Sequence, residues 1–163
     1  MDYDLIIIGA GPAGYVAGIR AGQAGLKTAV IEKKNVGGMC LNWGCIPSKA
    51  MLESAKYFSR LGMAADFGVE GLDPKALKFS WEKAIKRSDR IVRRLTKGVE
   101  YLLKKNNVEI ISGTASIEAA DTVVIDNRLL KTKNIIIATG SYPRPLPFKV
   151  GDESRIINLE NMF

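Results

Sequence analysis

Short apolar runs and longer amphipathic segments alternate along this 163-residue chain. Residues 3–8, 27–31, 108–111 and 133–138 are apolar runs of the kind that form buried parallel strands. Helices are predicted from residue 12 to 23, from 45 to 60 and from 81 to 105, and the last has its apolar residues on one face. Runs at 116–119, 122–126 and 128–130, with a turn at Asp126-Asn127, predict a small antiparallel β-meander. The pattern therefore predicts an α/β fold.

A glycine-rich loop, Gly9-Ala10-Gly11-Pro12-Ala13-Gly14, joins the first strand to the first helix. In such a loop Gly9 permits a tight turn, Gly11 lets the backbone approach a pyrophosphate, and Gly14 lets helix and strand pack closely. Glu32 ends the second strand, where a carboxylate can accept hydrogen bonds from both hydroxyls of an adenosine ribose. The alternative for Glu32 is a solvent-facing strand end. We expect a Rossmann-like parallel sheet with flanking helices that binds a dinucleotide.

Both cysteines of the chain, Cys40 and Cys45, lie in one glycine-rich segment. A regular helix would hold their Cα atoms roughly 8 to 9 Å apart, whereas a disulfide needs about 4.4 to 6.8 Å. If the two are bridged, Gly44 and the residues before it must interrupt the start of the helix. A redox pair, two free thiols and half of a zinc site are the alternatives. Zinc is disfavoured because the chain has no histidine and no third cysteine.

The net charge of +7 comes mainly from the predicted helix at 81–105, which carries nine basic and three acidic residues. These charges lie opposite the apolar face, which indicates a solvated helix surface. Nucleic-acid binding is disfavoured because no reading motif accompanies the charge. No run approaches the ~20 apolar residues of a membrane span, and no signal peptide is visible. We expect a cytoplasmic protein without membrane contact, in which two cysteines are typical of redox chemistry.

The segment Gly37-Gly38-Met39-Cys40-Leu41-Asn42-Trp43-Gly44-Cys45-Ile46-Pro47-Ser48-Lys49 resembles the redox-disulfide motif of the FAD-dependent pyridine nucleotide-disulfide oxidoreductases. Within that family it is most similar to the dihydrolipoyl dehydrogenases. Glutathione reductases usually have valine after each cysteine and lysine at the position of Ser48. One departure is Met39, where the family commonly has threonine, so a hydroxyl contact to the cofactor is lost. The resemblance covers residues 1–163 but only the first part of such an enzyme, which implies an N-terminal part of the FAD-binding domain without the NAD-binding and dimer-interface domains.

The resemblance implies that FAD is bound and that NAD is a co-substrate whose site lies outside this chain. A thiolate of dihydrolipoamide would attack Cys40, the more exposed sulfur, and Cys45 would leave as a thiolate beside the flavin and pass the electron pair to FAD, which gives a hydride to NAD+. Lys49 would lie near the isoalloxazine and could stabilise negative charge developing there. The predicted catalytic residues are Cys40 and Cys45, and the predicted cofactor-binding residues are Gly9, Gly11, Pro12, Ala13, Gly14, Glu32, Lys33, Gly37, Gly38, Met39, Lys49, Ala115, Ala138, Thr139, Gly140 and Ser141.

The implied partners are dihydrolipoamide on a 2-oxo acid dehydrogenase complex or a glycine-cleavage carrier, and a second subunit in a homodimer. The family takes its catalytic base, a histidine, from that second subunit, and this chain has no histidine. We therefore expect no complete turnover by this chain alone. Two other functions are compatible with the sequence: another disulfide reductase, of the glutathione or mercuric type, and a non-catalytic nucleotide-binding module.

Overall fold

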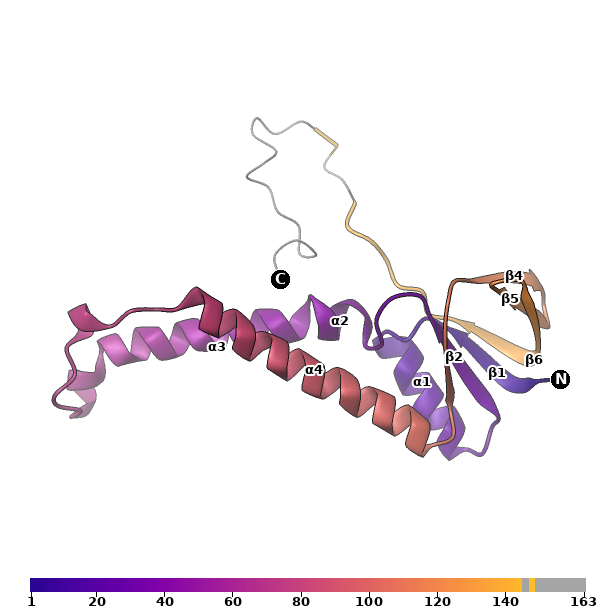
Figure 1. Cartoon of the computed structure of the whole chain (residues 1–163), viewed down its shortest axis with the longest axis horizontal. Helices are drawn as coiled ribbons and strands as arrows, with labels where there is room; N and C mark the ends of the chain where they lie inside the picture. Colours follow the sequence, from indigo (N-terminus) through magenta and orange to yellow (C-terminus); the bar gives the residue numbers. More distant parts are fainter. Residues whose placement is uncertain (145–146, 149–163) are drawn as a thin grey trace.

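A mixed sheet organises the chain (Figure 1). The computed structural model describes residues 1–144 and 147–148. Within them the sheet has six strands in the order β3-β2-β1-β6-β5-β4. Strands β3, β2, β1 and β6 pair in parallel, and β6, β5 and β4 pair antiparallel. The strands are β1 (Tyr3–Ile8), β2 (Thr28–Glu32), β3 (Glu109–Ser112), β4 (Ala115–Ala119), β5 (Thr122–Ile125) and β6 (Arg128–Ile137).

The helices lie between these strands in the chain. They are α1 (Pro12–Gln23), α2 (Gly38–Asn42), α3 (Cys45–Gly62) and α4 (Trp81–Lys105), with two short 3-10 turns, η1 (Ala64–Phe67) and η2 (Pro74–Ala76). The predicted helices at 12–23, 45–60 and 81–105 are confirmed, the second with two further residues. The helix α2 was not predicted.

Each face of the parallel strands carries its own apolar core. On one face, Leu5, Ile7 and Val30 pack with Ala21 of α1 and with Val99 and Leu103 of α4. On the other, Ile6, Ile8 and Ile31 pack with Val123 and Ile125 of β5 and Leu130 of β6. Because side chains alternate across a strand, the buried run of β1 supplies both cores. The predicted Rossmann-like sheet with flanking helices and an antiparallel meander is confirmed.

The strand β6 differs from the prediction, which placed separate strands at 128–130 and 133–138. Residues 128–131 pair antiparallel with β5, and from Thr132 onward the same strand pairs in parallel with β1. Thr132 is fully buried and its hydroxyl donates to the Asn134 carbonyl at 2.9 Å. The polar residues between the two apolar runs therefore mark a change of partner within one strand.

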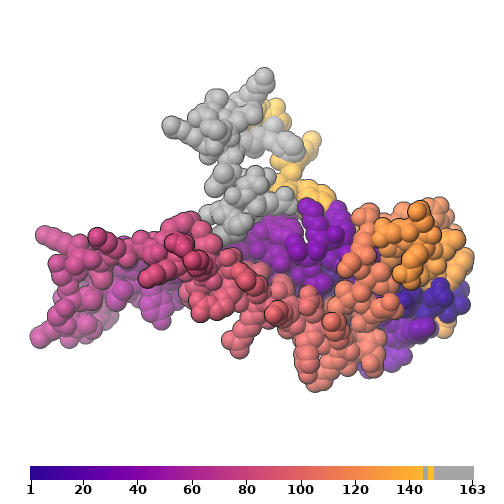
Figure 2. All heavy atoms as spheres, in the orientation of Figure 1, coloured from indigo at the N-terminus to yellow at the C-terminus, as the bar shows by residue number. Residues whose placement is uncertain are grey.

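The helices α3 and α4 form a hairpin that projects from the sheet (Figures 1 and 2). The Ser80 hydroxyl caps α4 by accepting from the Lys83 amide at 3.3 Å, and Arg87 donates to the Ala50 carbonyl of α3 at 2.9 Å. The nine basic residues of α4 are all exposed, as predicted for a solvated face. No helix among residues 1–144 and 147–148 has the length and apolar character needed to cross a bilayer.

A hydrogen bond from Tyr3 on β1 crosses β2 to reach Glu109 on β3, with the phenol donating to the carboxylate at 2.6 Å. Burial and this carboxylate raise the pKa of Tyr3 to about 12. Because the folded pKa lies above its ordinary value, the neutral phenol stabilises the fold below pH ~10, and this contribution is lost as pH rises toward 12.

We expect Glu109→Gln to lower the pKa of Tyr3, because the charge that opposes phenolate formation is removed. Phenolate absorbance measured against pH, with Tyr3→Phe to assign the transition, reports that pKa. Glu118→Gln removes an exposed carboxylate on β4 and is the control. Equal Tyr3 pKa values in Glu109→Gln and the control would contradict the prediction.

Candidate active site

The glycine-rich loop between β1 and α1 is held tightly against the end of β6. Gly9 has φ +106°, and a Cβ there would lie 2.2 Å from the Ala138 carbonyl oxygen. A Cβ at Gly14 would lie 1.8 Å from the Gly9 carbonyl oxygen. Pro12 occupies the first turn of α1, where the amides have no partner within the helix. The loop therefore packs as closely as predicted. It also presents free amides at the N-terminus of α1, a geometry suited to binding an anion.

Glu32 lies at the end of β2, beside the glycine-rich loop. One carboxylate oxygen accepts from the Ala10 amide at 2.8 Å, and the other accepts from the Lys34 amide at 2.9 Å. These bonds fix the carboxylate at the carboxyl end of the sheet. Each oxygen keeps a further lone pair, so the carboxylate can still accept hydrogen bonds from a ligand hydroxyl.

Gly37 and Gly38 bring the cysteine segment against the glycine-rich loop. The Gly37 amide donates to the Ala10 carbonyl at 2.8 Å. Both glycines have positive φ, +96° and +59°, and a Cβ on Gly38 would lie 2.7 Å from the Gly11 Cα. The helix α2 then begins directly beside the loop, although its five residues form only one turn. The Asn42 side chain closes this turn by donating to the carbonyls of Val36 and Gly38 at 3.1 and 2.9 Å.

The two cysteines lie on separate helices. Cys40 is within α2 and Cys45 is the first residue of α3. Between them Gly44 has φ −113° and ψ −110°, and a Cβ there would lie 2.9 Å from the Met39 carbonyl oxygen. The predicted interruption of the helix before Cys45 is thus confirmed. Both cysteines are free thiols in this structure, so the bridge between them stays a prediction.

The thiol of Cys45 lies close enough to that of Cys40 to affect its protonation. A hydrogen bond with the Cys45 thiol raises the pKa of Cys40, and burial raises it further. The nearby Lys49 ammonium acts in the opposite direction. Cys40 therefore holds its proton more strongly than an ordinary thiol. In a reduced pair, this favours Cys40 as the protonated member.

The exposure of the two sulfur-bearing residues is the reverse of the prediction. Cys45 is exposed, whereas Cys40 is half-buried and packs against the core shared by the sheet, α1 and α4. The reason is local: Cys40 lies inside the turn that docks on the glycine-rich loop, and Cys45 begins a new helix at the edge of a cavity. The expectation that Cys40 is the more exposed cysteine is wrong for this structure.

A cavity of about 630 Å³ joins these features. The predicted site residues that line it are Gly9, Gly11, Pro12, Ala13, Glu32, Lys33, Gly38, Met39, Cys40, Cys45, Ala138, Thr139, Gly140 and Ser141. A smaller cavity of about 160 Å³ is lined by Ala115 and shares Gly9, Glu32, Lys33 and Thr139 with the first. The structure therefore brings together most of the predicted residues, from five separate parts of the chain.

Three predicted residues do not line either cavity. Gly14 and Gly37 lie behind the lining, where they allow the close packing described above. Lys49 is exposed on the first turns of α3, outside the lining. Its predicted place near an isoalloxazine stays a prediction.

Several lining residues were not predicted: Ile8, Ile31, Lys34, Asn35, Trp43, Gly44, Ser48, Gly113, Thr114 and Tyr142. Most stand directly before or after a predicted residue in the chain, so adjacency could have found them. The indole Nε1 of Trp43 is buried without a hydrogen-bond partner among the described residues. Tyr142 directly follows the predicted Ser141, but its contact with Lys33 had no signal in the sequence, because that contact depends on where the chain runs after β6.

Comparison with known proteins points to one family. The family model of the pyridine nucleotide-disulphide oxidoreductases matches residues 3–162. A dihydrolipoyl dehydrogenase of Acholeplasma laidlawii is 50% identical over 140 residues, which are 86% of this chain and 41% of that protein. Proteins of the same name from Zymomonas mobilis and Mycoplasma genitalium are 43% and 47% identical, over 89% and 90% of this chain.

The chain spans only 32% of the length of those last two relatives. A family match over residues 3–162 nevertheless includes the glycine-rich loop, Glu32 and both cysteines, all of which the structure gathers around one cavity. On this evidence, the chain belongs to the pyridine nucleotide-disulphide oxidoreductase family.

Proposed function

We propose that this chain supplies the FAD-binding and dithiol part of a dihydrolipoyl dehydrogenase. The observation that carries the proposal is the cavity that joins the glycine-rich loop and the Glu32 carboxylate to the Cys40–Cys45 pair. A dinucleotide site and a pair of thiols lining one cavity suit two-electron exchange between a thiol substrate and a bound cofactor. The relatives that share this segment carry the same enzyme name.

The residues around the cavity fit a flavin dinucleotide. An elongated ligand needs a continuous site, and the two cavities with their shared lining provide one. A Cβ added at Gly11 would meet only the Gly38 Cα, at 4.0 Å, so the glycine leaves ligand space where any other residue would project. The amide of Ala13 in the first turn of α1 can bind a pyrophosphate, and Glu32 can accept from ribose hydroxyls. Bound there, FAD would supply a two-electron carrier between the dithiol and NAD+.

The chain's own chemistry is thiol–disulfide exchange. A thiolate of dihydrolipoamide attacks the sulfur of Cys40 in a Cys40–Cys45 disulfide, and the Cys45 sulfur leaves with the electron pair. The second substrate thiol then displaces Cys40, which releases lipoamide and leaves Cys40 and Cys45 reduced. The raised pKa of Cys40 favours the proton on this sulfur in the reduced pair.

The proposed setting follows from this chemistry. Dihydrolipoamide would be presented by a lipoyl-carrying complex, and the site for NAD+ would lie in a part of the parent enzyme beyond this chain. A homodimeric parent would bring the base that holds the substrate proton, because this chain has no histidine. We place the enzyme in the cytoplasm, where thiols are kept reduced.

Binding of FAD to the purified chain tests the cofactor site. We expect flavin fluorescence to be quenched as FAD binds. We expect Glu32→Ala to bind FAD about tenfold or more weakly, because the hydrogen bonds from ribose hydroxyls to the charged carboxylate are lost. Glu118→Ala removes an exposed carboxylate far along the chain and serves as the control. No binding by the wild-type chain would contradict the cofactor site, and an unchanged affinity in Glu32→Ala would contradict the ribose role.

A further inference from the structure

Lys33 and Tyr142 contact each other at the carboxyl end of the sheet. The Lys33 ammonium donates a hydrogen bond to the Tyr142 hydroxyl and lies 4.8 Å from the centroid of its ring. The Tyr142 hydroxyl, as acceptor, raises the pKa of Lys33 and so favours its charged form. Together, the hydrogen bond and the contact with the ring fix the position of the Lys33 ammonium.

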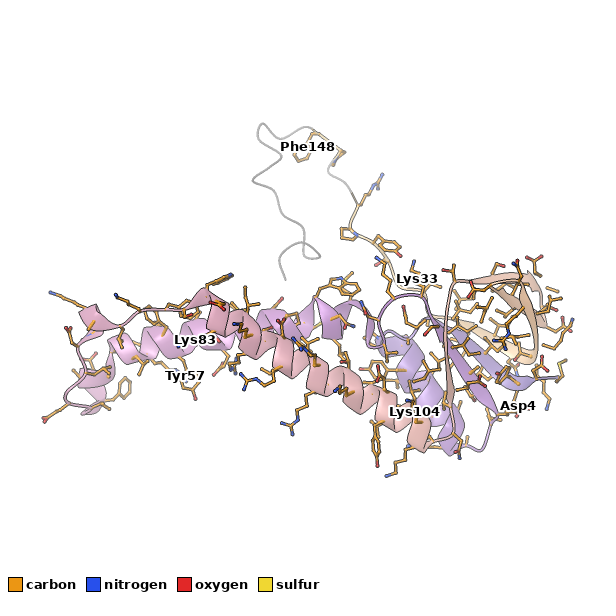
Figure 3. All side chains as sticks on the ribbon, in the orientation of Figure 1. Asp4, Lys33, Tyr57, Lys83, Lys104 and Phe148 are labelled. Atoms are coloured by element: carbon orange, nitrogen blue, oxygen red, sulfur yellow. The ribbon has the colours of Figure 1, made fainter. Side chains whose placement is uncertain are left out.

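The Lys33–Tyr142 contact joins two segments that lie far apart in the chain. Lys33 directly follows β2, Tyr142 follows β6, and β1 lies between these two strands in the sheet. Strand β1 leads into Gly9, so the pair spans the start of the glycine-rich loop, and both residues line the main cavity. Figure 3 shows Lys33 beside the segment that leaves the sheet after β6.

The pair is poorly suited to a purely structural role. The Tyr142 side chain is 60% exposed and Lys33 is exposed as well, so their contact contributes little to folding. An ammonium that lines the same cavity as the N-terminus of α1 instead suits an anionic ligand. Lys33 also lines the smaller cavity, so its charge lies where the two cavities meet.

We propose that Tyr142 is a positioning residue that holds the Lys33 ammonium over the cavity, where it binds the negatively charged phosphates of the dinucleotide. This inference rests on the proposed function, since it requires that the cavity bind FAD. It gives Tyr142 a role beside the residues after β6, Ala138 to Ser141, that line the cavity together with the glycine-rich loop, the end of β2 and the cysteine segment. The phenol acts through Lys33 and needs no contact with the reacting atoms.

Dissociation constants for FAD and for ADP, which shares its adenosine diphosphate half, test the proposal. We expect Lys33→Met and Tyr142→Ala each to weaken both ligands about tenfold, the loss of one charge-assisted contact. The double variant should be no weaker than Lys33→Met, because the two residues act as one unit. Tyr142→Phe keeps the ring over the cation and should restore part of the affinity.

Tyr101→Ala is the matched control, because Tyr101 is 62% exposed and lies on α4 away from the cavity. The affinity of Tyr142→Ala should also respond less to salt than that of wild type, with an unchanged thermal midpoint. Unchanged affinity in Tyr142→Ala, or additive losses in the double variant, would overturn the role of Tyr142 while leaving the cofactor site intact. Failure of the wild-type chain to bind either ligand would overturn the proposed function and this inference together.

Discussion

Replacing Gly14 with alanine should destabilise the chain by more than about 3 kcal/mol, beyond what a small overpacked side chain usually costs. The added Cβ would lie 1.8 Å from the Gly9 carbonyl oxygen and 2.8 Å from its carbonyl carbon. These are backbone atoms of the loop that leaves β1, so no side-chain rotation can relieve the overlap. Either the loop or the whole of α1 would have to move.

Chemical denaturation of the purified variant measures this loss, and Gly98→Ala in α4 is the matched control. A Cβ at Gly98 meets no atom within 4 Å among the described residues. The same substitution should therefore stabilise α4 by up to about 1 kcal/mol, because alanine is the better helix former. Opposite signs for the two variants are expected. A Gly14→Ala chain as stable as wild type would contradict the close packing between the loop and α1.

The backbone elements that the sequence predicted best are those with a long or uniform pattern. The 25 residues of α4 repeat an apolar face often enough that its bounds, Trp81 and Lys105, agree with the prediction. The buried run of β1 is equally clear, since five of its six residues are buried. In both cases local pattern and tertiary burial indicate the same structure.

The elements that the sequence did not predict correctly depend on contacts between residues that are far apart in the chain. The helix α2 has five residues, begins with a glycine in the left-handed region and is stabilised by docking on the glycine-rich loop. Strand β6 seemed broken because Lys131, Thr132 and Lys133 interrupt its apolar residues. Its continuity comes from pairing with β5 on one stretch and with β1 on the next, which no local pattern encodes.

The candidate site shows the same division. The glycine-rich loop and Glu32 could be predicted because their chemistry needs those residue types next to one another in a strand–loop–helix unit. The exposure of Cys40 and Cys45 could not, because it depends on which helix docks on the core. Tyr142 likewise reaches Lys33 only through the order of the strands.

Replacing Cys45 with serine should abolish reaction of the oxidised chain with dihydrolipoamide. In wild type, each substrate molecule would reduce one Cys40–Cys45 bridge and leave as lipoamide, so two protein thiols appear for every disulfide consumed. Without the Cys45 sulfur no internal bridge can form. Cys45 is exposed, and serine is nearly isosteric, so the fold should persist.

Thiol counts before and after substrate addition, together with lipoamide release, measure the reaction. Cys40→Ser should be equally inactive, because both sulfurs are needed for the bridge, and Ser48→Ala changes another residue lining the cavity without removing a sulfur. Circular dichroism confirms that each variant is folded. Stoichiometric lipoamide release by Cys45→Ser would contradict the redox pair.

The two cysteine variants should differ only in what the surviving thiol does. In Cys40→Ser the remaining Cys45 is exposed at the cavity and should react rapidly with a small disulfide reagent. In Cys45→Ser the remaining Cys40 is half-buried within α2 and should react more slowly. A slower reaction at Cys40 would mean that a substrate thiol reaches this sulfur only after α2 shifts or after the bridge exposes it. Access of dihydrolipoamide to Cys40 would then depend on whether the disulfide is formed.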